Sequence, residues 1–135
     1  MAFFIPGLTV LLITLFPLSA QDTGSLEIVY HQKTFRHLKG SSAELSCKAN
    51  YNFELCEVID VFWLYTAKNI ELTDPRKYFT TVNETDMGNN RRSRLIVTKI
   101  FRVTAGDSGR YQCKAECNRG EETAMGHFIT IIVGE

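Results

Sequence analysis

The chain has 135 residues, with fifteen basic and fifteen acidic side chains, so its formal net charge at pH 7 is zero. A charge balance of this kind favours neither a nucleic acid nor an anionic membrane surface as the partner. The length is sufficient for one domain with a modest hydrophobic core.

The first twenty residues carry no charged side chain and have an apolar centre at residues 8–16. This pattern is typical of a secretory signal peptide that is cleaved near Ala20. A membrane anchor is the alternative, but prolines interrupt the apolar run, which is shorter than the roughly 20 residues of a membrane span. We therefore expect a signal peptide at residues 1–20, one secreted domain at residues 21–135 and no membrane span.

The remaining chain consists of short alternating and β-branched segments, separated by polar turns. Gly40-Ser41-Ser42 forms one of these turns, and residues 69–75 form a longer turn-rich connection. No helical period, internal repeat or low-complexity tract is present, so the sequence predicts an all-β domain. The predicted strands are residues 26–30, 43–47, 61–65, 76–82, 94–100, 110–115 and 127–133.

Four cysteines lie in the predicted secreted part, at positions 47, 56, 113 and 117. An even number in an exported chain indicates a disulfide framework, for which three pairings are possible. Cys113 and Cys117 lie on or near one extended strand, about 13 Å apart at the strand rise, whereas a disulfide allows at most about 7 Å between Cα atoms. This distance excludes the pairing that joins them, and two pairings remain.

Cys47 and Cys113 frame the only tryptophan, Trp63, and the second cysteine ends the run Asp107-Ser-Gly109-Arg-Tyr111-Gln-Cys113. This pattern resembles the immunoglobulin fold, a β-sandwich of two antiparallel sheets with Greek-key connections. The resemblance covers nearly the whole predicted domain. It implies a Cys47–Cys113 disulfide across the core, with Trp63 packed against it and Tyr111 as the tyrosine corner. Asp107 and Gly109 would turn the chain into the strand that holds Tyr111.

The same resemblance places Cys56 and Cys117 in two loops at one end of the sandwich, so a disulfide between them is expected there. Such a bridge would hold the loops in place for a ligand and reduce the entropy lost on binding. The alternatives are a purely stabilising bridge of about 2–4 kcal/mol and an intermolecular bridge through Cys56. The candidate ligand-binding residues at this end are Tyr51, Asn52, Phe53, Glu54, Asn118, Arg119 and Glu121.

A second candidate surface is the outer face of the sheet that holds Trp63. Side chains alternate between faces along a strand, so Phe62 and Leu64 point outward if Trp63 points inward. The last predicted strand is apolar on both faces, although a strand that is wet on one side should be polar there. We therefore expect an exposed apolar patch with Phe62, Leu64 and Ile131, which would bind a protein ligand or a second copy of the chain. A strand or loop that covers this patch is the alternative.

Asn83-Glu-Thr85 is an N-glycosylation sequon in polar sequence, and we expect a glycan on Asn83. The cluster Arg91-Arg-Ser-Arg94 is interpreted as a solvated loop, with binding of an acidic protein face or a sulphated glycan as the alternative. The three histidines show no metal-ligand spacing, and no phosphate loop, nucleophile elbow or paired-carboxylate arrangement is found in the sequence. The sequence therefore predicts a protein without a metal, a cofactor or an enzymatic activity.

Within the immunoglobulin superfamily, the cysteine spacing is compatible with a variable-type or an intermediate-type domain. The run from Asp74 through Tyr78-Phe-Thr-Thr-Val82 to Arg91-Arg-Ser-Arg-Leu-Ile-Val-Thr98 resembles the membrane-proximal domains of interleukin-1-receptor-type proteins. Phe62-Trp-Leu64 is similar to the interleukin-18-binding proteins, which implies a soluble decoy that binds a cytokine. The ectodomain of a cell-surface receptor or adhesion molecule is one alternative, and a matrix protein that self-associates is another. In each case the expected partner is another protein.

Overall fold

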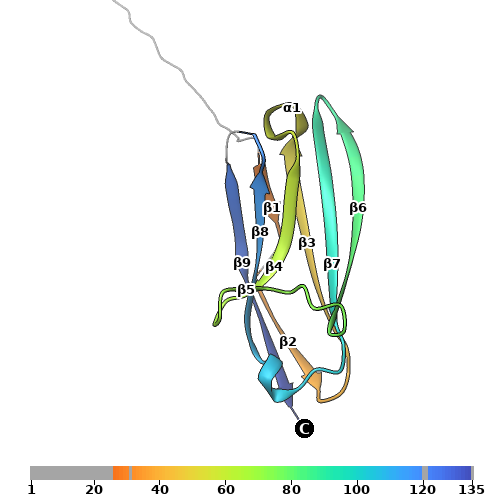
Figure 1. Ribbon diagram of the computed structural model, residues 1–135, viewed down its shortest axis with the longest axis vertical. Helices are drawn as coiled ribbons and strands as arrows, with labels where there is room; N and C mark the ends of the chain where they lie inside the picture. Colours follow the sequence, from red (N-terminus) through yellow and green to blue (C-terminus); the bar gives the residue numbers. More distant parts are fainter. Residues whose placement is uncertain (1–25, 31, 120–121, 135) are drawn as a thin grey trace, which may run out of the picture.

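The computed structural model describes residues 26–30, 32–119 and 122–134. The predicted signal peptide at residues 1–20 and the predicted contact residue Glu121 lie outside the described residues. The described part is elongated and has two layers of strands (Figure 1). In chain order its elements are β1 (Leu26–Val29), β2 (Lys33–Leu38), β3 (Ala43–Asn52), α1 (Phe53–Cys56), β4 (Ile59–Tyr65), β5 (Ile70–Glu71), β6 (Tyr78–Gly88), β7 (Arg91–Ile100), η3 (Ala105–Asp107), β8 (Gly109–Cys117) and β9 (Thr123–Gly134).

The strands form two sheets that pack face to face. One sheet has the order β1-β3-β7-β6 and is antiparallel. The other has the order β2-β9-β8-β4-β5, and in it β2 runs parallel to β9. The predicted all-β sandwich is confirmed, and its second sheet contains one parallel pair, β2 and β9, among antiparallel ones. The reason is a crossover after Val29, because β1 pairs with β3 in one sheet and β2, which was not among the predicted strands, pairs with β9 in the other.

Strand β3 shows how alternation builds the core. Cys47 of this strand forms a disulfide with Cys113 of β8, with 6.3 Å between the Cα atoms. Trp63 of β4 is 1% exposed and belongs to the same core cluster. This pairing is the one that the immunoglobulin-like pattern implied. The inward-facing residues of β3 are Ala43, Leu45, Cys47, Ala49 and Tyr51.

The chain enters β8 through the short 3-10 turn η3, which polar contacts hold in place. The Tyr111 hydroxyl donates to the Asp107 carbonyl (2.6 Å), which is the predicted tyrosine corner. The Asp107 carboxylate accepts from a backbone amide at the start of the turn (2.8 Å) and from the Lys77 ammonium group (2.7 Å). Gly109 has a φ of +145°, and a Cβ there would lie 2.9 Å from the Tyr65 ring, so glycine is required. Burial raises the pKa of Tyr111 above its ordinary value.

Tyr30 occupies a gap in the ladder between β8 and β9. The register between these two strands shifts at Cys113. There the Tyr30 hydroxyl accepts from the Cys113 backbone amide (3.3 Å) and donates to the His127 backbone carbonyl. A Cβ on Gly126 would lie under 3.0 Å from the Tyr30 ring, so the ring lies directly against this glycine. Tyr30 therefore bridges the two strands and ties the crossover between β1 and β2 to the second sheet.

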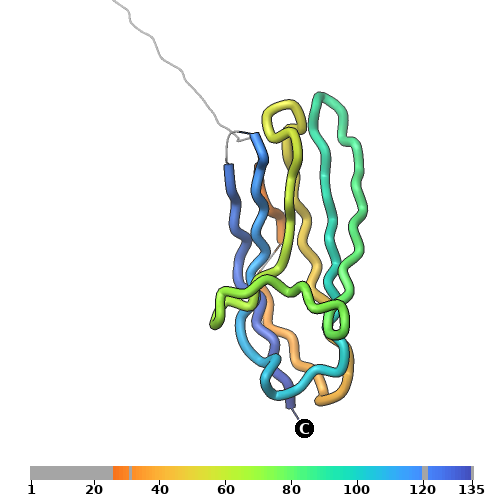
Figure 2. The backbone as a smooth tube through the Cα atoms, viewed as in Figure 1, coloured from red at the N-terminus to blue at the C-terminus, as the bar shows by residue number. Residues whose placement is uncertain are grey.

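Strands β6 and β7 form a long hairpin at one side of the molecule (Figure 1). It turns at Asn89 and Asn90, whose φ angles of 55° and 62° are left-handed and are tolerated by asparagine in two-residue hairpin turns. The arginines of the cluster Arg91–Arg94 therefore begin β7, and their predicted position in a loop is wrong. Figure 2 shows the chain crossing from β5 to the start of this hairpin, and thus from one sheet to the other.

Candidate functional site

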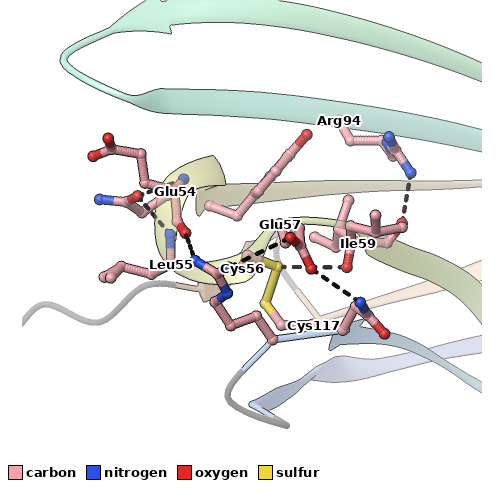
Figure 3. The surroundings of a disulfide bond; sticks show 12 residues. Glu54, Leu55, Cys56, Glu57, Ile59, Arg94 and Cys117 are labelled. Carbon is pink, nitrogen blue, oxygen red and sulfur yellow. Dashed lines mark hydrogen bonds and ion pairs between the residues drawn. A yellow bond between two sulfur atoms is a disulfide. The ribbon is translucent and has the colours of Figure 1, made fainter.

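One end of the molecule is closed by the second disulfide. Cys56 and Cys117 are joined with 4.8 Å between their Cα atoms, as the sequence pattern implied. Cys56 ends the single helical turn α1, which begins because the Asn52 side chain accepts from the backbone amides of Glu54 (3.0 Å) and Leu55 (3.1 Å). We call residues 52–58 and 117–119 the stapled end (Figure 3).

Polar side chains add to the disulfide at the stapled end. The Arg119 guanidinium group donates to the Glu54 carbonyl (3.3 Å) and lies 3.5 Å from the Glu57 carboxylate. The Asn118 amide donates to the other oxygen of Glu57 (3.2 Å), and the Asn118 backbone amide donates to the Val58 carbonyl (2.8 Å). Asn118 and Arg119 were predicted to contact a ligand, and in the free protein their side chains hold the two loops together.

The stapled end is also tied to the turn of the β6–β7 hairpin. The Phe53 backbone amide donates to the Asn90 carbonyl (3.0 Å), and the Asn90 side chain donates to the Glu54 carboxylate (2.6 Å). The Arg92 guanidinium group lies 4.2 Å from the centre of the Phe53 ring, a cation–π contact that leaves this ring only half exposed. The segment 52–58 is therefore fixed from two sides before any ligand binds.

Tyr51 does not belong to the exposed surface of this end. Its side chain is 2% exposed, and its hydroxyl donates to the Glu84 carboxylate. The prediction that Tyr51 contacts a ligand is wrong because β3 continues to Asn52 and the alternation of this strand turns Tyr51 into the core. The exposed apolar side chains here are Leu55 and Val58, at 57% and 62% exposure, and neither was among the predicted contact residues.

The outer face of the five-stranded sheet differs from the prediction in strand β9. Ile131 is 1% exposed and faces the core together with Ile129, so its assignment to an exposed patch is wrong. Leu64 faces outward from β4 but is only 9% exposed, whereas Phe62 is partly exposed. Alternation leaves Phe128 on the outer side of β9, and the Arg110 guanidinium group lies 5.2 Å from its ring centre. The apolar patch is therefore smaller than the sequence predicted.

A shallow groove of about 400 Å³ lies where this outer face meets the stapled end. Asp60 of β4 stands opposite Glu116 of β8, so two carboxylates face the groove from paired positions. The pKa of Glu71 on β5 is raised above its ordinary value, mainly by burial and also by the negative charges of Asp60 and Glu116. The three carboxylates are therefore close enough to repel one another. The Lys114 ammonium group offsets part of this charge, 3.3 Å from Glu116. We call this site the acidic groove, and its lining residues are Val58, Asp60, Glu116, Cys117, Asn118 and Thr123.

The acidic groove brings together residues from both predicted surfaces. Val58 and Asn118 come from the stapled end, and Asp60 shares the outward side of β4 with Phe62. The sequence could have indicated Asp60, because it alternates with Val61 and Trp63 in a strand that was predicted correctly. Glu116 was missed because β8 extends two residues beyond the predicted strand, as far as Cys117.

Among the described residues, no group of three or more histidine, cysteine, aspartate or glutamate side chains is arranged to hold a metal ion. In the same part of the chain, no helix has the length and apolar character needed to span a membrane.

The family model for the immunoglobulin domain matches residues 34–124 of this chain. Among solved structures, a crystal structure of Dpr2 Ig1-Ig2 in complex with DIP-Theta Ig1-Ig3 is similar, with a TM-score of 0.64 and 14% sequence identity. The match covers 81% of this chain and 32% of that chain, so this chain spans about a third of the length of its structural neighbour. At this identity the likeness shows the fold alone. No curated protein matches the chain.

Proposed function

Because the chain belongs to the immunoglobulin family, we propose that it is a secreted protein that binds another protein through the acidic groove and the apolar side chains beside it. The acidic groove on a braced end of the sandwich is the observation that carries this proposal. Members of this family are typically not enzymes, and the proposed role is binding without catalysis. The structural neighbour is a complex between immunoglobulin proteins, which supports a protein as the class of partner.

The braced end suits binding because little order has to be gained when a partner arrives. The Cys56–Cys117 disulfide, the Arg119 contacts and the Asn90 contacts already fix the backbone of residues 52–58. Each rotamer-rich side chain that is ordered only on binding costs about 0.5–1.5 kcal/mol. A surface that is ordered beforehand avoids much of this cost, so its exposed groups contribute more of their contact energy to affinity.

The chemistry of the site indicates the kind of surface that it recognises. Val58 in the groove and Leu55 at the same stapled end offer exposed apolar area, and Phe62 offers a partly exposed aromatic ring on the sheet. Asp60 and Glu116 supply carboxylates that a lysine or arginine of the partner would neutralise. The partner is therefore proposed to present a basic side chain flanked by apolar residues, since complementary charges and apolar anchors together give specificity and affinity.

Secretion is part of the proposal and rests on the uncharged, apolar start of the sequence and on the two disulfides, which form in oxidising compartments. A soluble decoy for a cytokine and the ectodomain of a cell-surface immune receptor would both use such a groove. The identity of the partner distinguishes these two roles, because a decoy binds a soluble cytokine and a receptor ectodomain binds a protein on another cell.

The experiment screens the folded, secreted protein against an array of purified cytokines and cell-surface ectodomains. Any partner found is then measured with the Asp60→Lys/Glu116→Lys variant and with a control, Glu27→Lys/Glu44→Lys, which makes the same charge change on exposed residues of the other sheet. We expect the groove variant to lose about tenfold or more in affinity and the control to keep its affinity. Equal affinity of both variants, or binding lost equally in both, contradicts the acidic groove as the site.

A further inference from the structure

Strand β6 is a long exposed edge. It pairs with β7 on one side, and no other described strand lies on its second side. Its eleven residues extend over roughly 36 Å at the usual rise of a strand. Strand β5 of the facing sheet has only two residues, so it leaves most of the inner side of β6 uncovered, and every β6 residue after Tyr78 is exposed. An edge of this length presents a row of backbone groups with which another strand can pair.

The side chains of β6 do little to prevent such pairing. Exposed edges are commonly protected by lysine or proline, and β6 contains neither. The stretch Tyr78–Asn83 has no charged residue and is rich in aromatic and β-branched side chains, the composition that favours pairing between strands. Phe79 and Val82 are well exposed within it. Glu84 is the nearest charge, and it is already bound to Arg94 (2.7 Å) and to Tyr51.

The sequon occupies the middle of this edge. Asn83 is exposed, and its place opposite Leu95 in the ladder puts it on the outer face of the four-stranded sheet. There it borders a hollow of about 390 Å³ whose other lining residues are Lys48, Asn50, Thr85, Met87, Ser93 and Leu95. The side-chain oxygen of Asn50 has no hydrogen-bond donor among the described residues, and rotation of this amide would offer it to a sugar hydroxyl.

We propose that Asn83 carries an N-linked glycan that lies over this hollow and keeps β6 from pairing with β6 of a second copy. The bulky, hydrated sugar would stand beside the uncharged stretch of the edge and block the approach of another strand. It would lie on the sheet opposite to the acidic groove, and so it leaves the proposed ligand surface free. This inference rests on the proposed secretion, because the sugar is transferred in the secretory pathway.

The transfer needs one co-reactant, an oligosaccharide linked to a lipid diphosphate. The Asn83 side-chain nitrogen forms a bond to the anomeric carbon of the first sugar. The bond between that carbon and the diphosphate oxygen breaks, and the lipid diphosphate leaves with the bonding electron pair. One amide proton of Asn83 is lost to base, and no oxidation or reduction takes place. Thr85 completes the acceptor sequence Asn-X-Thr.

The test uses the full chain expressed in glycosylating cells. The wild type is compared with Asn83→Gln and Thr85→Ala, which destroy the sequon, and with Thr85→Ser, which keeps it. Intact mass reports the glycan, and light scattering at two concentrations reports the oligomeric state. We expect glycosylated monomers for the wild type and Thr85→Ser, and glycan-free protein that associates as the concentration rises for the other two variants.

A second pair of variants identifies the edge that pairs. Thr81→Lys, added to Asn83→Gln, places a charge on β6 and should restore the monomer. Leu38→Lys, added to Asn83→Gln, places the same charge on the exposed edge strand β2 and should not restore it. The inference is also supported if the Asn83→Gln and Thr85→Ala variants are missing from the medium and the added Thr81→Lys substitution restores secretion.

Three results overturn the inference. They are a wild-type chain that is secreted without a glycan, glycan-free variants that stay monomeric at both concentrations, and association or loss from the medium that Thr81→Lys does not relieve. Secretion without a glycan leaves the proposed function intact. A wild-type chain that is retained in the cells contradicts the proposed secretion itself, so the two failures are distinguishable.

Discussion

The Tyr30 hydroxyl bridges β8 and β9, and its removal should destabilise the domain. Tyr30→Phe removes the hydroxyl that accepts from the Cys113 amide and donates to the His127 carbonyl. The ring stays and keeps its contact with Trp63, 5.5 Å between centroids. The substitution leaves a buried amide without an acceptor, which costs about 1–3 kcal/mol. We expect a loss of unfolding free energy in this range.

The glycine beneath the ring gives the second half of the prediction. A Cβ on Gly126 would lie under 3.0 Å from the ring and hydroxyl of Tyr30. The ring cannot move freely because it packs against Trp63 and is bonded to Cys113. Overpacking of this kind costs about 1–3 kcal/mol, so Gly126→Ala should destabilise the domain by at least that amount. In a Tyr30→Ala background the ring is absent, and the cost of Gly126→Ala should fall to near zero.

The assay is urea unfolding, followed by tryptophan fluorescence, of Tyr30→Phe, Tyr30→Ala, Gly126→Ala, the double variant Tyr30→Ala/Gly126→Ala and a control. Gly134→Ala is the control, because a Cβ at this glycine of the same strand meets no atom within 4 Å. The coupling energy between positions 30 and 126 should be about 1–3 kcal/mol, within the range of about 0.5–3 kcal/mol seen for residues in contact. Additive effects in the double variant, or a cost at Gly126 no larger than at Gly134, would refute the proposed contact.

Further predictions concern the Cys56–Cys117 disulfide, Asp107 at the tyrosine corner, and the carboxylates of Glu71 and Glu84. The Cys56→Ala/Cys117→Ala variant should lose about 2–4 kcal/mol of unfolding free energy in urea, and unchanged stability contradicts the bracing role. Asp107→Asn should cost about 1–3 kcal/mol, because the Lys77 ammonium group 2.7 Å away loses its charged partner, and thermal unfolding measures this loss. Burial and the charges of Asp60 and Glu116 raise the pKa of Glu71 above 4.5. The contribution of Glu71 to stability is therefore complete below pH 4.5 and is lost as the pH rises through the raised pKa. Glu71→Gln should therefore raise Tm at neutral pH. At Glu84, burial raises the pKa, but hydrogen bonds from Tyr51 and Arg94 outweigh it and lower the pKa below its ordinary value. Glu84→Gln should therefore lower Tm at neutral pH, and this effect should disappear as the pH falls below 4.5. Both effects should be a few tenths of a kcal/mol, since both carboxylates remain accessible to solvent. Tm shifts of the same sign contradict the reasoning.

The fold could be predicted because its signature depends on local chemistry. Cys47 and Cys113 form the core disulfide, Trp63 is buried in the same core, and the Tyr111 hydrogen bond to Asp107 joins residues four positions apart. Such features can be recognised without knowing which strands are neighbours. The disulfide at the stapled end followed from the same framework, since two loops at one end of a sandwich bring Cys56 and Cys117 together.

The site was harder to predict because burial depends on neighbours that are distant in sequence. Strand β9 is apolar on both faces, and only its packing against the opposite sheet decides that Ile129 and Ile131 face inward. Tyr51 looked like a loop residue because nothing local shows that β3 continues past Cys47. The hydrogen bonds of Tyr30 span residues 30, 113 and 127, and no periodicity in the sequence indicates such a bridge. Asn89-Asn90 was a usable turn signal that was not recognised.

The arrangement of charge at the acidic groove opposes folding, and this is an argument for its role in binding. Like charges directly opposite each other on paired strands are destabilising, and Asp60 stands opposite Glu116. Lys114 offsets only part of this repulsion, while the neighbouring Cys56–Cys117 disulfide supplies stability at the same end of the sheet. Residues that break a local rule of stability tend to lie at functional sites. A pair of like charges thus lies beside a disulfide-braced end of the sheet, where a basic partner would relieve the repulsion and bind to an ordered surface.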